Sequence, residues 1–170
     1  MMIYTNDTFE VDAMRKVAAW ANLSPDPSTQ NAAALHDGVN LLWDTLAVNE
    51  FPEGVRYYPD RWDRPIKYSY IEHAERNCIY KAARIGQRTA GMTMICPWAA
   101  CSDCARGIVQ AGIPRLVTLA PKDGDTHDRW EQSIAVALKI LEEGGVNVAL
   151  IQGPLDVTFT IRRDGKPLVL

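Results

Sequence analysis

The sequence predicts an α/β protein in which helices flank a partly parallel β-sheet. The prediction rests on helices that alternate with strands in the second half of the chain, and on a hairpin that precedes them. Apolar residues make up 47% and charged residues 23% of the 170 residues, an ordinary globular composition. We therefore expect one domain spanning residues 1–170 that buries a core without disulfide bonds.

The N-terminal part is expected to hold a helix and then a hairpin. Asp7 with Glu10 forms a capping-box-like start, and apolar residues recur at helical spacing until about Ser24. Residues 32–35 and 39–48 have the composition of two strands joined by a tight turn.

The rest of the chain is expected to alternate loops, helices and strands. Residues 49–68 mix aromatic, proline and charged residues without periodicity, which predicts a loop long enough to suspect a function. The expected helices cover residues 70–85, 101–111 and 128–143, each stopped by glycine. The expected strands cover residues 91–96, 116–119 and 146–151, followed by a hairpin that turns at Asp164–Gly165.

Charge and apolar patterning exclude several classes of protein. The net charge is −3 and no basic tail is present, so we expect no stable nucleic-acid binding, although one nucleotide could occupy a pocket. No run of about 18 apolar residues exists, so no membrane span is expected. Acidic residues interrupt the N-terminus, which argues against a signal peptide. We expect a cytoplasmic protein, in which a cysteine pair indicates a metal or catalytic site before a disulfide.

Two short motifs carry the chemistry. They are His73-Ala74-Glu75 and Cys101-Ser102-Asp103-Cys104, each expected in the first turn of a helix. Cysteines three residues apart share a helix face, so both sulfurs can reach one ion with His73 as a third ligand. One nitrogen and two sulfurs suit Zn²⁺, and a three-ligand zinc keeps a position for water, as catalytic sites do. The two motifs together are far more specific than either alone.

The other cysteines and histidines suit this site poorly. His36 lies in a distant turn, His127 precedes a late helix, and Cys78 is five residues past His73 on another helix face. Cys96 lies one strand upstream of the pair, and both it and Cys78 are expected as buried small apolar residues. A redox dithiol stays an alternative for the C-x-x-C pair considered alone.

Glu75 is the expected proton carrier. Two helix N-termini at the metal favour thiolates and a bound hydroxide, and zinc can lower the pKa of its water to about 7. The carboxylate of Glu75, two residues from His73, can take that proton and return it to a leaving amine.

At these residues the chain resembles the cytidine and deoxycytidylate deaminase superfamily. The resemblance extends to the flanking residues 24–30, 49–54, 67–77 and 104–113, and covers roughly residues 10–150. It implies a three-layer fold whose central mixed sheet has five strands flanked by helices. It also implies one Zn²⁺ held by His73, Cys101 and Cys104, with Glu75 as the proton shuttle.

The resemblance further implies contacts to the substrate. Asn49 and the backbone of Ala74 would contact the base and sugar. Trp98 lies in the loop that leads to the metal cysteines, which makes it a candidate for stacking on a base. Ala100 stands where the family has proline before its first cysteine, so the loop over the base is expected to differ in shape.

The leading hypothesis is hydrolysis of dCMP to dUMP and ammonia by a homo-oligomer, a dimer or hexamer, with dCTP and dTTP as candidate effectors. The alternatives are deamination of a 5-substituted dCMP, cytidine or a purine base, and a non-catalytic zinc-stabilised nucleotide-binding module. Candidate phosphate partners cluster before the zinc helix, although a solvated loop is the commoner reason for such a cluster: Arg56, Arg61, Arg64 and Lys67.

Overall fold

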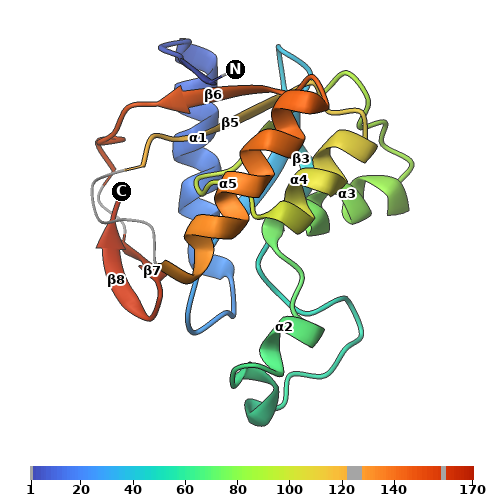
Figure 1. Ribbon diagram of the computed structural model, residues 1–170, viewed down its shortest axis with the longest axis vertical. Helices are drawn as coiled ribbons and strands as arrows, with labels where there is room; N and C mark the ends of the chain where they lie inside the picture. The colour runs from blue at the N-terminus through green and yellow to red at the C-terminus, as the bar shows by residue number, and fades with distance from the viewer. Residues whose placement is uncertain (1, 122–127, 158–159) are drawn as a thin grey trace.

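A mixed β-sheet of six strands forms the centre of the fold (Figure 1). The computed structural model describes residues 2–121, 128–157 and 160–170. The strand order is β1-β6-β5-β4-β2-β3, with bounds β1 Met2–Tyr4, β2 Ala32–His36, β3 Leu41–Val48, β4 Thr93–Ile95, β5 Arg115–Leu119 and β6 Asn147–Ile151. Strands β1, β6, β5 and β4 run parallel, whereas β2 is antiparallel to β3 and β4. The mixed α/β fold is confirmed, with β1 as one strand more than the five expected.

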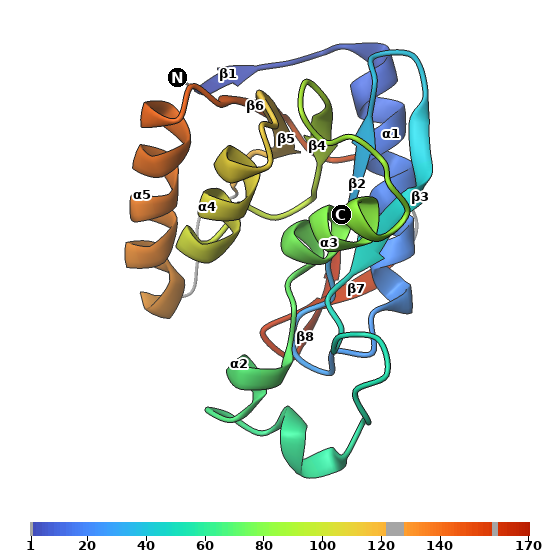
Figure 2. The ribbon, with the colours of Figure 1, turned by 90° about the vertical axis from the view of Figure 1, so that its right-hand side faces the viewer.

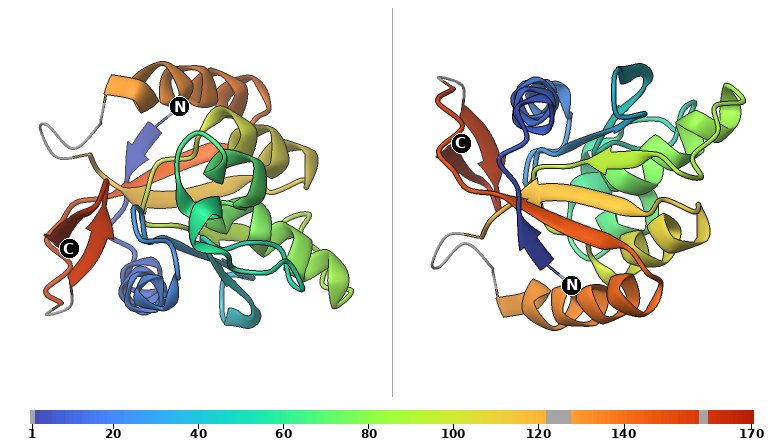
Figure 3. Two further views of the ribbon diagram at one scale, coloured as in Figure 1. Left: turned by 90° about the horizontal axis from the view of Figure 1, so that it is seen from below. Right: turned by 90° about the horizontal axis from the view of Figure 1, so that it is seen from above.

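Helices cover both faces of the sheet (Figures 2 and 3). One face packs against α1 (Thr8–Trp20) and a separate hairpin of β7 (Thr160–Arg163) and β8 (Lys166–Val169). The other face packs against α3 (Ala74–Arg84), α4 (Ser102–Gln110) and α5 (Asp128–Glu143). Three short helical turns lie in the connections: η1 Ala21–Leu23, η2 Pro59–Trp62 and α2 Lys67–Tyr70.

Side chains that alternate along the central strands pack into two cores, one on each face of the sheet. Met94 and Leu116 face α3, α4 and α5, whereas their neighbours Ile95 and Val117 face α1, and all four are buried. This alternation is the two-residue period of an extended strand. Burial on both faces explains why these strands appear in the sequence as short continuous apolar runs.

Helix α3 begins later than the sequence pattern predicts. A continuous helix over residues 70–85 is wrong, because the chain leaves helical conformation after α2 and resumes it at Ala74. In the gap, Glu72 exchanges two backbone hydrogen bonds with Glu50, with N–O distances of 2.9 and 3.2 Å. This long-range bridge leaves His73 extended as the N-cap of α3.

Other expected elements are found within a few residues of their predicted bounds. The hairpin of β2 and β3 and the one that turns at Asp164–Gly165 are both confirmed. Residues 49–68 form a long excursion that carries η2 and projects from the body of the fold (Figure 1). None of the helices in the described ranges has both the length and the apolarity that crossing a bilayer requires.

Candidate metal centre and substrate pocket

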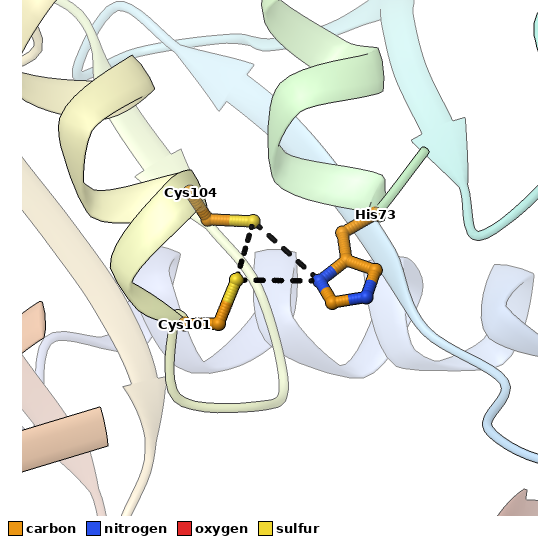
Figure 4. A group of neighbouring side chains, drawn as sticks. All are labelled: His73, Cys101 and Cys104. Atoms are coloured by element: carbon orange, nitrogen blue, oxygen red, sulfur yellow. Dashed lines mark hydrogen bonds between the residues drawn. The ribbon is translucent and has the colours of Figure 1, made fainter. Parts of the chain in front are cut away.

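Three side chains from the N-termini of α3 and α4 converge on one point (Figure 4). His73 Nδ1 lies 3.5 Å from Cys101 Sγ and 3.7 Å from Cys104 Sγ, and the two sulfurs are 3.5 Å apart. A tetrahedral zinc ion with bonds of about 2.3 Å to sulfur and about 2.0 Å to nitrogen would separate its ligands by about 3.5–3.8 Å. These residues therefore fit Zn²⁺ closely.

The local backbone explains why the three ligands meet. Cys101 is the extended N-cap of α4 and Cys104 lies in its first turn, so both sulfurs leave the helix at the same end. His73 is the extended N-cap of α3, held there by the bridge between Glu50 and Glu72. Both helix N-termini point their partial positive charge at the thiolates that a cation would bind.

Without a metal the three ligands share protons, and a bound cation would take the place of those protons. Hydrogen bonds that Cys104 and His73 donate to Cys101 lower the pKa of Cys101 to about 4, which favours its thiolate form. The same hydrogen bond raises the pKa of Cys104, which keeps the shared proton. Burial lowers the pKa of His73, but the Cys101 sulfur and the charge of Glu75 outweigh that effect and raise it.

No fourth histidine, cysteine, aspartate or glutamate joins the cluster within the described ranges. Cys78 and Cys96 are free and buried, and burial raises the pKa of Cys78 to about 12. His36 is buried elsewhere, where its Nδ1 accepts a hydrogen bond from the Gly38 N–H. His127 lies outside the described residues.

Glu75 lies in the wall of a pocket beside the three ligands. Its side chain is 2% exposed, and its Oε2 has no hydrogen-bond partner among the described residues. Burial raises the pKa of this carboxyl group. Since buried polar atoms in native proteins are nearly always paired, an unpaired carboxylate oxygen in a pocket marks a position for a ligand or a reacting group.

The residues that line the pocket come from segments that are far apart in the sequence. Segments 26–31, 64–75 and 98–101 line it together with Asn49, the start of α5 and the turn of the β7–β8 hairpin. His73, Glu75 and Cys101 are part of this wall, so the metal ligands and the carboxylate open into one cavity.

Residues 12–120 match the family described as the cytidine and deoxycytidylate deaminase zinc-binding region. The chain belongs to this family.

Known relatives agree with this assignment. An uncharacterized deaminase in the luxG 3′ region of Aliivibrio fischeri is 32% identical over 141 residues, which cover 83% of this chain and 88% of that protein. The deoxycytidylate deaminase of Mus musculus is 29% identical over 114 residues, 64% of this chain and 62% of that enzyme, so this match spans less than two thirds of the mouse protein.

A solved structure shows the same fold. The dCMP deaminase of cyanophage S-TIM5 aligns with a TM-score of 0.66 at 19% identity, over 88% of this chain and all of that one. The chain is thus a hydrolytic deaminase with the zinc-binding region of its family.

Of the four residues expected to contact the substrate, two line the pocket and two lie behind its wall. Asn49 and Trp98 line the pocket, whereas Ala74 and Ala100 are buried and are not among the described residues of its wall. Asn49 Oδ1 accepts the Ala74 N–H at 2.8 Å, and its Nδ2 donates to Thr29 O at 2.8 Å. Asn49 therefore fastens the start of α3 to the pocket wall.

Trp98 is held by Gln30 and by the C-terminal hairpin. Its Nε1 donates to the backbone oxygen of Gln30 at 3.0 Å, and the guanidinium carbon of Arg163 lies 4.4 Å from the centre of its ring. Such a stacked cation stabilises the ring orientation. Ala100 packs below this loop in the core formed with α3, α4 and α5.

The four expected phosphate partners separate into two pairs. Arg64 and Lys67 line the pocket. Arg56 and Arg61 lie on the excursion, where Arg61 donates to the backbone oxygen of Arg56 and stacks on Tyr70. Arg56 and Arg61 are not among the described residues of the pocket wall.

Lys67 and Asp26 form a buried ion pair in the pocket wall. Lys67 Nζ lies 2.6 Å from Asp26 Oδ1, and both side chains are almost fully buried. The same carboxylate oxygen accepts the N–H groups of Ser28 and Thr29 at 2.8 and 3.1 Å. This pair holds the excursion against segment 26–31.

The sequence alone did not reveal the part played by the C-terminal hairpin. Gly165 N donates to Ser28 O at 2.8 Å, and Arg162 exchanges hydrogen bonds of 2.9 Å with Gln30 through both its N–H and its backbone oxygen. These bonds place Arg163 and Asp164 in the pocket wall. The only local signal was the Asp164–Gly165 turn, because the pairing spans more than 130 residues.

Proposed function

We propose that this deaminase removes the amino group of a cytosine nucleotide, with deoxycytidylate as its principal substrate. The observation that carries the proposal is the unpaired, buried Oε2 of Glu75 beside a cluster of three metal-ligating side chains. Named relatives support the substrate class: a 45-residue stretch is 49% identical to the deoxycytidylate deaminase of phage T4. The similar cyanophage dCMP deaminase was also solved with dCMP and dUMP.

Zinc held by His73, Cys101 and Cys104 would supply a water molecule acidic enough to serve as a nucleophile near neutral pH. Glu75 takes one proton from the attacking water and gives it to the ring nitrogen, and then takes the second proton of the same oxygen and gives it to the departing amine. Burial raises the pKa of Glu75, which makes its protonated form easier to reach during this transfer. A C–O bond forms at C4, the C–N bond breaks, and ammonia leaves.

The rest of the pocket suits a phosphorylated ligand. Arg64 and Arg163 bring positive charge into the wall from the excursion and from the C-terminal hairpin. Arg64 donates to Ser28 Oγ at 2.6 Å and lies 3.8 Å from the carboxylate of Asp164. Guanidinium groups in such a wall are the usual partners of a phosphate group.

Ammonia release by the zinc-loaded protein tests the proposal. We expect the highest kcat/KM with dCMP, lower values with 5-methyl-dCMP and deoxycytidine, and none with guanine. Equal use of deoxycytidine and dCMP would contradict phosphate recognition, and preference for guanine would contradict a pyrimidine substrate. Zinc-loaded protein that releases ammonia from none of them would favour a non-catalytic zinc module. Adding dCTP or dTTP to the same assay tests both expected effectors.

A further inference from the structure

Two asparagines line the pocket, and their side-chain amides are used differently. Both ends of the Asn49 amide are bonded to backbone, at Ala74 N and Thr29 O. Asn31 is 4% exposed, and its amide meets only the sulfur of Cys96 among the described residues. The Asn49 amide is therefore held by two backbone groups, which are strong partners, whereas the buried Asn31 amide is held only by a weak partner.

The Cys96 sulfur cannot satisfy the Asn31 amide. Asn31 Nδ2 lies 3.2 Å and Oδ1 lies 3.6 Å from the same Sγ. A thiol is a weak donor with one hydrogen and a weak acceptor, whereas a carboxamide offers two N–H groups and two lone pairs. Burial keeps Cys96 protonated by raising its pKa. At least one N–H and one lone pair of Asn31 thus remain for a ligand in the pocket.

Asn31 stands at the reacting end of the pocket. It directly precedes β2, and its backbone oxygen accepts the Asn49 N–H at 3.1 Å, which joins it to the end of β3. Asn49 in turn accepts the N–H of Ala74, the residue before Glu75, and both Asn31 and Glu75 line the pocket. Since Glu75 must reach the amine, the ring that bears the amine must lie at this end as well.

The chemistry of a cytosine ring leaves one acceptor for such an amide. The exocyclic amine is the leaving group, and the ring nitrogen beside it receives the proton from Glu75. The carbonyl on the far side of that nitrogen takes no part in the proton transfers. A buried N–H donor in the ring-binding end of the pocket is complementary to this carbonyl oxygen.

We propose that Asn31 is a specificity-determining residue of this deaminase and that its Nδ2 donates a hydrogen bond to the carbonyl oxygen of the substrate ring. The inference rests on the proposed function, because it takes a cytosine nucleotide as the ligand. Asn31 selects rings that carry an acceptor there, while Asn49 holds the helix that bears Glu75.

The test pairs a change in the protein with a matching change in the substrate. Asn31→Leu removes the amide at similar volume, and 2-thio-dCMP replaces the carbonyl with a much weaker acceptor. Wild-type holoenzyme should favour dCMP over 2-thio-dCMP in kcat/KM by about tenfold, the worth of one buried hydrogen bond. Asn31→Leu should lower kcat/KM for dCMP by a similar factor, mainly through KM, and bring the ratio between the two substrates close to one.

Two further variants separate recognition from packing. Cys96→Ala removes the sulfur but keeps the amide, so it should retain the wild-type substrate ratio. Asn31→Ser keeps a polar group but cannot reach the ring, so it should lose the ratio even if the leucine variant fails to fold. Equal losses with both substrates in the Asn31 variants, or a ratio lost in Cys96→Ala, would overturn the proposal.

Binding measurements distinguish failure of this inference from failure of the proposed function. Dissociation constants for both nucleotides are measured by equilibrium dialysis with zinc-loaded protein. If dCMP binds more tightly than 2-thio-dCMP, this preference requires Asn31, and no ammonia is released, then dCMP is not the substrate but the proposed role of Asn31 stands. Deamination of dCMP with a substrate ratio that ignores Asn31 would refute the role of Asn31 and keep the substrate.

Discussion

At the scale of one residue, Glu75 combines a cost in folding stability with the expected role of proton carrier. Its carboxylate is buried, and its Oε2 has no partner among the described residues. Glu75→Gln keeps the shape and removes the group that carries the proton, so we expect turnover to fall by about 10²–10⁴-fold. Zinc content should stay unchanged, and the unfolding midpoint should be equal or higher because an unpaired buried acid is costly. Ammonia release and bound zinc, measured on one sample, check this; turnover close to wild type would contradict it.

Two buried cysteines offer a matched test of the metal ligands. Cys104 and Cys78 are both fully buried in the same core, but only Cys104 lies in the metal cluster. We expect Cys104→Ala to lose its zinc and its activity, whereas Cys78→Ala should keep one zinc per chain. Metal analysis of the purified variants checks this. Retention of stoichiometric zinc by Cys104→Ala would show that the ligand set is different.

At the scale of secondary structure, the C-terminal hairpin fastens the pocket wall. Ile161 of β7 is 1% exposed and lies in the core with α1, whereas Val169 of β8 is 58% exposed. Ile161→Ala should cost about 2–4 kcal/mol of unfolding free energy and raise KM, because segment 28–30 loses its support. Val169→Ala should change the unfolding free energy by less than about 0.5 kcal/mol. Denaturant unfolding and steady-state kinetics compare the two variants. Equal KM values would show that the hairpin does not contribute to substrate binding.

The sequence predicts elements well where their signals are local. Cysteines three residues apart, or glycines that end helices, need no distant partner to be recognised. The break before α3 is different, because it depends on the bridge from Glu72 to Glu50, more than 20 residues away. Strand β1 has three residues and is defined by its pairing with β6. Asn31, Arg163 and Asp164 also reach the pocket wall through contacts that are distant in sequence, so no local motif predicts them.

For the whole molecule, a partly buried ion pair joins α1 to the sheet. Glu10 is 6% exposed, and Arg115 of β5 donates to both of its carboxylate oxygens at 2.7 and 2.9 Å. Burial raises the pKa of Glu10, but the hydrogen bonds from Arg115 outweigh it, so the folded pKa lies below the ordinary value of 4.5. This stabilisation is present above pH 4.5 and is lost as the pH falls through the lowered pKa.

Glu10→Gln should therefore flatten the acid side of the stability curve. We expect the variant to be less stable than wild type at pH 7, and the difference to shrink steadily as the pH falls below about 4.5. Urea unfolding at a series of pH values checks this. A constant difference between wild type and variant from pH 7 to pH 3 would show that Glu10 does not titrate in this way.

The homo-oligomeric state stays a prediction, which sedimentation velocity can test.

The order in which the pocket residues occur along the chain has a consequence for synthesis. The metal ligands are complete once residue 104 has been made, but Arg163 and Asp164, which close the wall beside Trp98, come some 60 residues later. A growing chain thus contains all three ligand residues before the hairpin residues of the wall have been added. The ligand cluster and the complete pocket wall thus depend on different lengths of the chain.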